Sequence, residues 1–84
     1  MKRRTKMLRM YLSNAREAKG YSFRRTAREA GMSLQHYANI EYGKRGDRVS
    51  FMIMARISKA LGLSLDDMAV EEAKYQHEIH NEDY

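Results

Sequence analysis

Two amide side chains, Gln35 and Asn39, lie four residues apart in the stretch GMSLQHYANIEYG, residues 31–43. If this stretch is helical, both amides fall on one stripe together with Tyr42, because an α-helix turns by about 100° per residue. An amide offers a hydrogen-bond donor and an acceptor together, as a base edge in the DNA major groove does. Most exposed Gln and Asn pairs face only water, so the spacing alone is weak evidence of a DNA site.

The elements around this pair predict how it is held. Ser33 is a suitable N-cap for a helix over residues 34–42, with Tyr37 and Ile40 on the opposite face. A preceding helix over 23–30 has Ser22 as its N-cap and ends at Gly31. Two helices joined by a turn of about three residues form a helix-turn-helix, in which the second helix lies across the major groove.

The remaining sequence also indicates helices. Apolar residues at three- and four-residue spacing predict helices over 6–19 and from Ser50 or Phe51 to Leu61, and Ser64 with Asp67 forms a capping box for a fifth helix beginning at Leu65. We therefore predict an all-α fold, a compact five-helix bundle. Its expected buried residues include Met7, Leu8, Met10, Tyr11, Leu12, Ala15, Ala18, Phe23, Thr26, Ala27, Ala30, Met32, Phe51, Met52, Met54, Ile57, Ser58, Leu61 and Met68.

Charge is divided unevenly along the chain. The whole sequence has 16 Lys and Arg against 11 Asp and Glu. Residues 69–84 hold five acidic residues and one lysine, a net charge of −4, so residues 1–68 carry +9. A body this basic is typical of proteins that bind a polyanion such as nucleic acid. We divide the chain into a basic N-terminal arm (1–6), a helix-turn-helix domain (7–68) and an acidic C-terminal tail (69–84) that either extends the fifth helix or frays.

Four segments together resemble the phage repressor and Cro-like helix-turn-helix family, also called the xenobiotic-response-element type. They are AREAKGYS, AREAGMS, IEYGKR and ISKALGLSLDDM, within residues 8–68. The resemblance implies a repressor-like bundle that binds double-stranded DNA through residues 34–42. It also implies base readout by Leu34, Gln35 and Asn39, and contacts at or near the DNA backbone by Ser33, His36, Tyr42, Lys44 and Arg45.

Physical chemistry assigns these residues different roles. Gln35 is the best candidate for paired hydrogen bonds to adenine, and Asn39 is the second. Leu34 either packs on a thymine methyl group or is a partly buried helix end. Tyr42 either donates its hydroxyl to phosphate or covers the edge of the core. The resemblance gives Glu41 a structural role, bracing the turn through a nearby arginine or a backbone amide.

The chain departs from the family pattern at Phe23, where the family commonly has a glutamine that contacts phosphate. Arg24 and Arg25 can replace that contact with charge, and Arg28 lies one turn later. The loop after Arg45 looks about two residues longer than the commonest form. It adds Arg48 to the candidate backbone contacts.

Other functions find little support in the sequence. Neither a Ser-His-Asp arrangement nor a glycine-rich phosphate loop is present, so we predict no enzyme activity. With no cysteine, and only His77 and His80 at helical spacing around Glu78, we predict no metal and no cofactor. The charged N-terminal residues lead into no apolar stretch, so we expect no signal peptide, no membrane span and a cytoplasmic location.

We therefore expect a sequence-specific transcriptional regulator, a repressor that binds a palindromic operator as a homodimer. One short helix reads few base pairs, whereas two helices about 34 Å apart read a palindrome. We expect a bacterial protein bound to DNA, with phage or mobile-element origin as one alternative. The alternative function is an antitoxin or adaptor on the same fold that binds a protein partner through the C-terminal tail.

Overall fold

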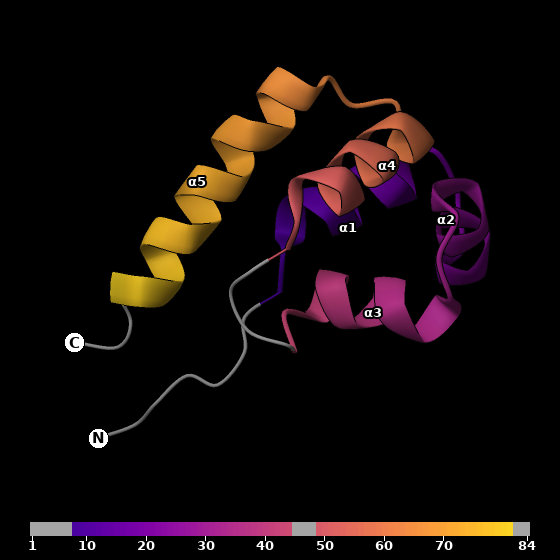
Figure 1. The fold of residues 1–84 in the computed structure, drawn as a ribbon, viewed down its shortest axis with the longest axis horizontal. Helices are drawn as coiled ribbons and strands as arrows, with labels where there is room; N and C mark the ends of the chain where they lie inside the picture. Colours follow the sequence, from indigo (N-terminus) through magenta and orange to yellow (C-terminus); the bar gives the residue numbers. More distant parts are fainter. Residues whose placement is uncertain (1–7, 45–48, 82–84) are drawn as a thin grey trace.

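A computed structural model describes residues 8–44 and 49–81, with side chains placed as far as Ile79. All regular structure in these residues is helical, and the helices form one bundle (Figure 1). The elements are α1 (Met10–Ala18), α2 (Phe23–Ala30), α3 (Leu34–Tyr42), α4 (Phe51–Leu61) and α5 (Leu65–Asn81). The predicted all-α, five-helix class is confirmed.

Four helices begin after a serine whose hydroxyl oxygen accepts a hydrogen bond from the backbone N–H three residues later. Such a bond satisfies one of the N–H groups that a helix start leaves without a partner. This agrees with the starts predicted from the sequence. The bonds are Ser22 to Arg25 at 3.0 Å, Ser33 to His36 at 3.1 Å, Ser50 to Ile53 at 3.2 Å and Ser64 to Asp67 at 2.9 Å.

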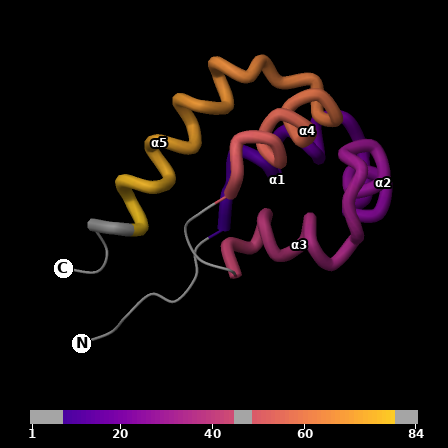
Figure 2. Tube along the Cα trace, in the orientation of Figure 1, coloured from indigo at the N-terminus to yellow at the C-terminus, as the bar shows by residue number. Residues whose placement is uncertain are grey.

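Helix α2 lies between α3 and α4 in the packing of the bundle, because it contacts both. In Figure 2, α2 is seen nearly along its axis while α3 lies across the view, so the two helix axes cross. Helix α4 packs in turn against α5, and α1 packs against α3. This arrangement places α3 along one edge of the bundle, with α1, α2 and α4 on one side of it (Figure 1).

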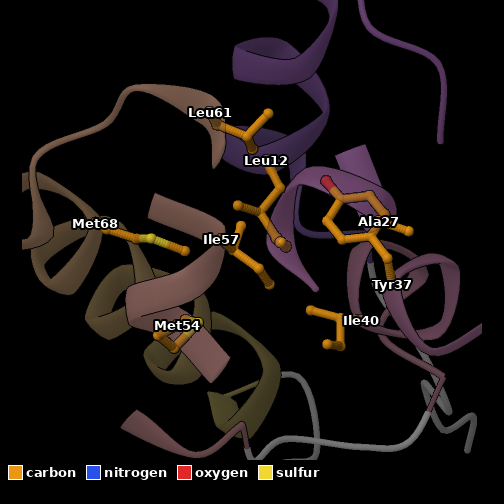
Figure 3. Packing of buried hydrophobic residues seen from close by; sticks show 9 residues of the cluster. Leu12, Ala27, Tyr37, Ile40, Met54, Ile57, Leu61 and Met68 are labelled. Atoms are coloured by element: carbon orange, nitrogen blue, oxygen red, sulfur yellow. The ribbon is translucent and has the colours of Figure 1, made fainter. Parts of the chain in front are cut away.

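A single apolar cluster fills the space between the helices. Leu12 from α1, Tyr37 from α3 and Ile57 from α4 are completely buried (Figure 3). The rest of the cluster comes from α2, α3, α4 and α5, and consists of Ala27, Ala30, Ile40, Met54, Leu61 and Met68. The core therefore depends on side chains from every helix.

The predicted start of the first helix is wrong for the described residues. Helix α1 begins at Met10, whereas Lys6 and Met7 lie outside the described residues. Arg9 has the non-helical backbone angles φ −83° and ψ 82°. Its backbone N–H donates to the carbonyl oxygen of Glu41 at 2.9 Å, so the chain is bound to α3 before α1 begins.

Several apolar residues expected in the core are exposed. Most of them lie at or near the starts of α1 and α4. Ala18 is exposed at the end of α1. The large ones are Leu8 (46% exposed), Met10 (53%), Phe51 (68%) and Met52 (61%).

Helix α5 continues through the acidic segment as far as Asn81. Tyr75, which lies beyond the boundary drawn at residue 68, is buried with 5% exposure. Glu72 pairs with Arg9 at the other end of the described chain. The second half of α5 therefore packs against the body of the bundle.

Candidate nucleic-acid interface

Helix α3 exposes the residues that the sequence predicted to read bases. Leu34 is 38% exposed, Gln35 is exposed, and Asn39 is half-buried one turn later. Gln35 and Asn39 lie on the side of α3 away from the buried Tyr37 and Ile40, whereas Leu34 is partly exposed in the first turn, close to the boundary with the buried side. The structure thus brings the two predicted amides together, with Leu34 beside them at the start of the helix.

The two amides of this surface are joined. The side-chain nitrogen of Gln35 donates a hydrogen bond to the side-chain oxygen of Asn39 at 3.0 Å. This bond uses neither the carbonyl oxygen of Gln35 nor its second N–H, which remain an acceptor and a donor, as an adenine edge requires. Asn39 therefore orients Gln35.

The opposite side of α3 is fixed to α1 by a buried carboxylate. Glu41 is 2% exposed and accepts hydrogen bonds from Arg16 Nε at 3.0 Å and from the Tyr37 hydroxyl at 2.6 Å. Arg16 also donates to the carbonyl oxygen of Tyr21 at 2.9 Å. This confirms the structural role expected of Glu41 and identifies Arg16 as its arginine.

The ionisation of these groups suits a permanent anchor. The hydrogen bond to Glu41 raises the pKa of Arg16 more than partial burial lowers it. Burial raises the pKa of Tyr37, and its hydrogen bond to Glu41 raises that pKa further. Arg16 therefore remains charged and Tyr37 protonated at neutral pH.

The turn between α2 and α3 depends on Gly31. Its φ of 73° lies in the left-handed region, which glycine adopts without the strain that a side chain brings. Two residues later Ser33 accepts the hydrogen bond from the backbone N–H of His36. Both Ser33 and His36 are exposed, so the predicted backbone contacts at the start of α3 lie on the outer surface.

The three predicted backbone-contacting arginines of α2, Arg24, Arg25 and Arg28, are exposed. The guanidinium of Arg25 lies 4.3 Å from the centre of the Tyr21 ring and forms a loose ion pair with Glu29 at 3.9 Å. Tyr21 also lies 5.2 Å from the Lys19 ammonium group. Tyr21, which no pattern in the sequence singled out, thus orients Arg25.

The end of α3 carries two further predicted backbone contacts, Tyr42 and Lys44. Tyr42 is 41% exposed, and its ring packs edge-on against Phe23 with the centroids 5.4 Å apart. Phe23, found where the family has glutamine, thus supports Tyr42. Lys44 is exposed, whereas Arg45 and Arg48 lie outside the described residues.

A helix-turn-helix family profile matches residues 12–68, which is more than half of the chain. The chain belongs to this helix-turn-helix family. The predicted resemblance is confirmed, since the matching family is of the Cro/C1 type. Its members are non-enzymatic DNA-binding regulators, and the chain is accordingly a DNA-binding transcriptional regulator.

Solved structures of two regulators share this helix-turn-helix fold. The clp gene regulator ClgR from Corynebacterium glutamicum is 28% identical, with a TM-score of 0.67 over 80% of this chain and 84% of that one. A second structure of ClgR gives 28% identity and a TM-score of 0.68 over 82% and 71% of the two chains. The restriction-modification controller protein C.AhdI from Aeromonas hydrophila is 25% identical, with a TM-score of 0.65 over 71% and 88%.

No curated protein sequence matches the chain significantly. Within residues 8–44 and 49–81, no helix has the length and apolar character needed to cross a membrane. The family match begins at residue 12 and ends at 68, so it includes α3 but neither Arg9 nor Glu72.

Proposed function

We propose that the chain is a sequence-specific repressor that binds a palindromic operator as a homodimer, with α3 of each subunit in the major groove. The observation that carries this proposal is the exposed Gln35–Asn39 pair on a helix whose other side is anchored by Glu41. A rigid helix with an outward amide pair presents one hydrogen-bond pattern and therefore prefers one base sequence.

In this proposal Gln35 pairs with adenine, Asn39 holds it in place, and Leu34 packs on a thymine methyl group. Exposed cations and hydroxyls around α3 bind the sugar-phosphate backbone and set the position of the helix without reading sequence. These residues are Arg24, Arg25, Arg28, Ser33, His36, Tyr42 and Lys44, with Arg45 and Arg48 from the basic loop.

An apolar surface beside α4 supports the dimer. Among the residues that the structure describes, Phe51 and Met52 are the two most exposed large apolar ones. Phe51 lines a groove of about 360 Å³ between α4 and α5, whose other walls include Val49, Leu65 and Ala69. An exposed aromatic ring beside an apolar groove can be buried by a second copy, since a two-fold axis brings the same patch of both subunits together.

In this proposal, repression results when the dimer occupies its operator. A dimer that covers its operator sterically excludes other proteins from the same DNA, so an operator overlapping a promoter gives repression. A reporter gene placed behind the selected operator tests this directly. Expression should fall when the chain is present, whereas increased expression would show that the chain is an activator.

Selection of bound duplexes from a random DNA pool tests the function itself. The proposal predicts an enriched palindrome whose half-sites are about one helical turn, roughly 34 Å, apart. Enrichment of a single unsymmetrical site would contradict the dimer. A pool that remains random after repeated selection would contradict sequence-specific binding.

A protein-interaction module is the second candidate, favoured by the surface between α1 and α5. The exposed side chains of Leu8, Met10 and Val70 lie beside Glu71 and Glu78 in this region. Salt distinguishes the two functions: a DNA reader binds one duplex with steep salt dependence, whereas an adaptor binds DNA weakly and without sequence preference.

A further inference from the structure

Arg9 is a completely buried arginine that precedes α1 and contacts both α3 and α5. Its side chain is 1% exposed, and its backbone lies directly before α1. Its guanidinium donates two hydrogen bonds to Glu72 of α5, from Nε at 2.9 Å and from NH2 at 2.8 Å. The third nitrogen, NH1, donates to the backbone carbonyl of Ile40 in α3 at 2.9 Å.

Glu72 is held as firmly as Arg9. Besides the two bonds from Arg9, its carboxylate accepts hydrogen bonds from the Tyr11 hydroxyl at 2.6 Å and from the Gln76 side chain at 2.8 Å. The guanidinium of Arg9 lies over the Tyr75 ring, with its Cζ atom 4.3 Å from the ring centre. Among the described residues no buried side-chain polar atom lacks a partner, so the cluster is complete.

The contacts to α3 fall at the end of the recognition helix. Ile40 and Glu41 belong to its last turn, where carbonyl groups have no partner within the helix. Arg9 reaches both, through NH1 to Ile40 and through its backbone N–H to Glu41 at 2.9 Å. A cation at this end also complements the negative pole of the helix.

We propose that Arg9 and Glu72 are positioning residues for DNA binding: they fix the last turn of α3 to α5 and so set the direction in which Gln35 and Asn39 point. This inference rests on the proposed DNA-reading role of α3. It assigns a function to residues on both sides of the family segment, 12–68.

Two anchors then hold α3. Glu41 fixes it to α1 through Arg16, and Arg9 fixes the same turn to α5 through Glu72. A helix held only by the first anchor can still pack against the core but can rotate or shift at its end. Because recognition of a base edge depends on correctly aligned hydrogen bonds, a small shift weakens binding.

The test uses the full chain with Glu72→Gln and Arg9→Lys. Glutamine keeps the shape of Glu72 but removes its charge, and lysine keeps the charge of Arg9 but cannot reach both Glu72 and Ile40. Glu71→Gln removes a neighbouring, more exposed carboxylate, and Leu61→Val destabilises the core without removing a hydrogen-bond partner of Arg9 or Glu72. Affinity for the selected duplex is measured for each variant and corrected for its folded fraction from urea unfolding.

We expect Glu72→Gln and Arg9→Lys to weaken duplex binding by roughly ten- to a hundredfold after correction, the equivalent of one or two charge-assisted hydrogen bonds. Glu71→Gln and Leu61→Val should bind within about twofold of the unchanged chain after the same correction. Equal corrected affinities in all five proteins would overturn the proposal and leave Arg9 a purely structural residue.

Amide hydrogen exchange gives a second readout that needs no DNA. The backbone N–H groups of Arg9, Gly43 and Lys44 donate to α3 carbonyls and report on its last turn. In Glu72→Gln and Arg9→Lys these three should exchange faster relative to the amides of α4, whereas Leu61→Val should affect α4 at least as much. Faster exchange without any sequence-specific binding by the unchanged chain would refute the proposed function alone. Unaltered relative exchange would refute the positioning role alone.

Discussion

In the proposed complex, the hydrogen bond between Gln35 and Asn39 makes the two residues read the base together. Free glutamine side chains lose rotamer freedom when they bind a base, and this loss weakens binding. The 3.0 Å bond to Asn39 restricts Gln35 before DNA arrives. In the proposed complex, Asn39 therefore contributes part of the energy of a contact that Gln35 makes.

A double-mutant cycle on the selected operator measures this coupling. Gln35→Ala should cost about 1–3 kcal/mol and relax preference at its adenine. Asn39→Ala should weaken preference at the same position, and the double variant should lose less than the sum of the two. Strictly additive losses at two different base pairs would show that the amides read independently.

The arginines of α2 should contribute charge without specificity. Arg28→Ala should lower the slope of log affinity against log salt by about 1 and weaken binding to specific and random duplexes alike. Lys74→Ala on α5 is the matched control, since Lys74 is exposed but lies on a different helix. A loss confined to the selected operator would instead make Arg28 a base-reading residue.

Glu72 should make the fold sensitive to acid. Burial by itself would raise the pKa of Glu72, but hydrogen bonds from Arg9, Tyr11 and Gln76 bring that pKa below its ordinary value of 4.5. On acidification the unfolded chain therefore takes up this proton first. The stability from Glu72 is fully present above pH 4.5 and is lost as the pH falls through the lowered pKa.

Urea unfolding between about pH 6 and 3 tests this dependence. The free energy of unfolding of the unchanged chain should decrease with falling pH, and Glu72→Gln should show a shallower decrease because its side chain does not titrate. Glu71→Gln should keep the steep decrease. Parallel curves for all three proteins would mean that Glu72 contributes no acid sensitivity.

At the level of the helices, local signals predicted most of the boundaries. Ser22, Ser33 and Ser50 each precede the first residue of a helix, and Gly31 follows the last, because capping depends on residues adjacent in sequence. The start of α1 was predicted too early. Helix α1 starts only at Met10 because Arg9 is bonded to α3 and α5. No local sequence pattern contains contacts with residues 31 and 63 positions away.

Periodicity also misplaced part of the apolar surface. It assigned Phe51 and Met54 to one buried face, yet Phe51 is 68% exposed and Met54 only 8%. A helix face is buried only along the length that another element covers, and sequence periodicity does not give that length. The exposed first turn of α4 is therefore the better candidate for an interface between subunits.

Phe51→Glu tests the dimer interface. A charge at this apolar patch should weaken self-association by at least about tenfold, because a large buried aromatic contact is replaced by a desolvated carboxylate. Sedimentation at several protein concentrations measures the change, and Met10→Glu places the same charge on α1 as a control. Unchanged association of the Phe51 variant, or an equal loss in both, would exclude this groove as the dimer contact.

Over the whole molecule, sequence order was more informative than composition. The two helices around Gly31 and the four family-like segments predicted the all-α bundle and its DNA-binding role, and the family match confirms both. The candidate base-reading residues could be named because they lie within one short helix. Arg9 and Glu72 could not, since they are 63 residues apart and their pairing depends on the folded chain.

The outward-facing surface of α3 is the central claim, and chemical-shift mapping by NMR tests it most directly. Adding the selected duplex to the full chain should shift the signals of Leu34, Gln35 and Asn39 together with those of the exposed arginines of α2. The α1–α5 surface around Val70 should remain almost unchanged. Shifts concentrated around Val70, with the α3 signals unmoved, would contradict the account.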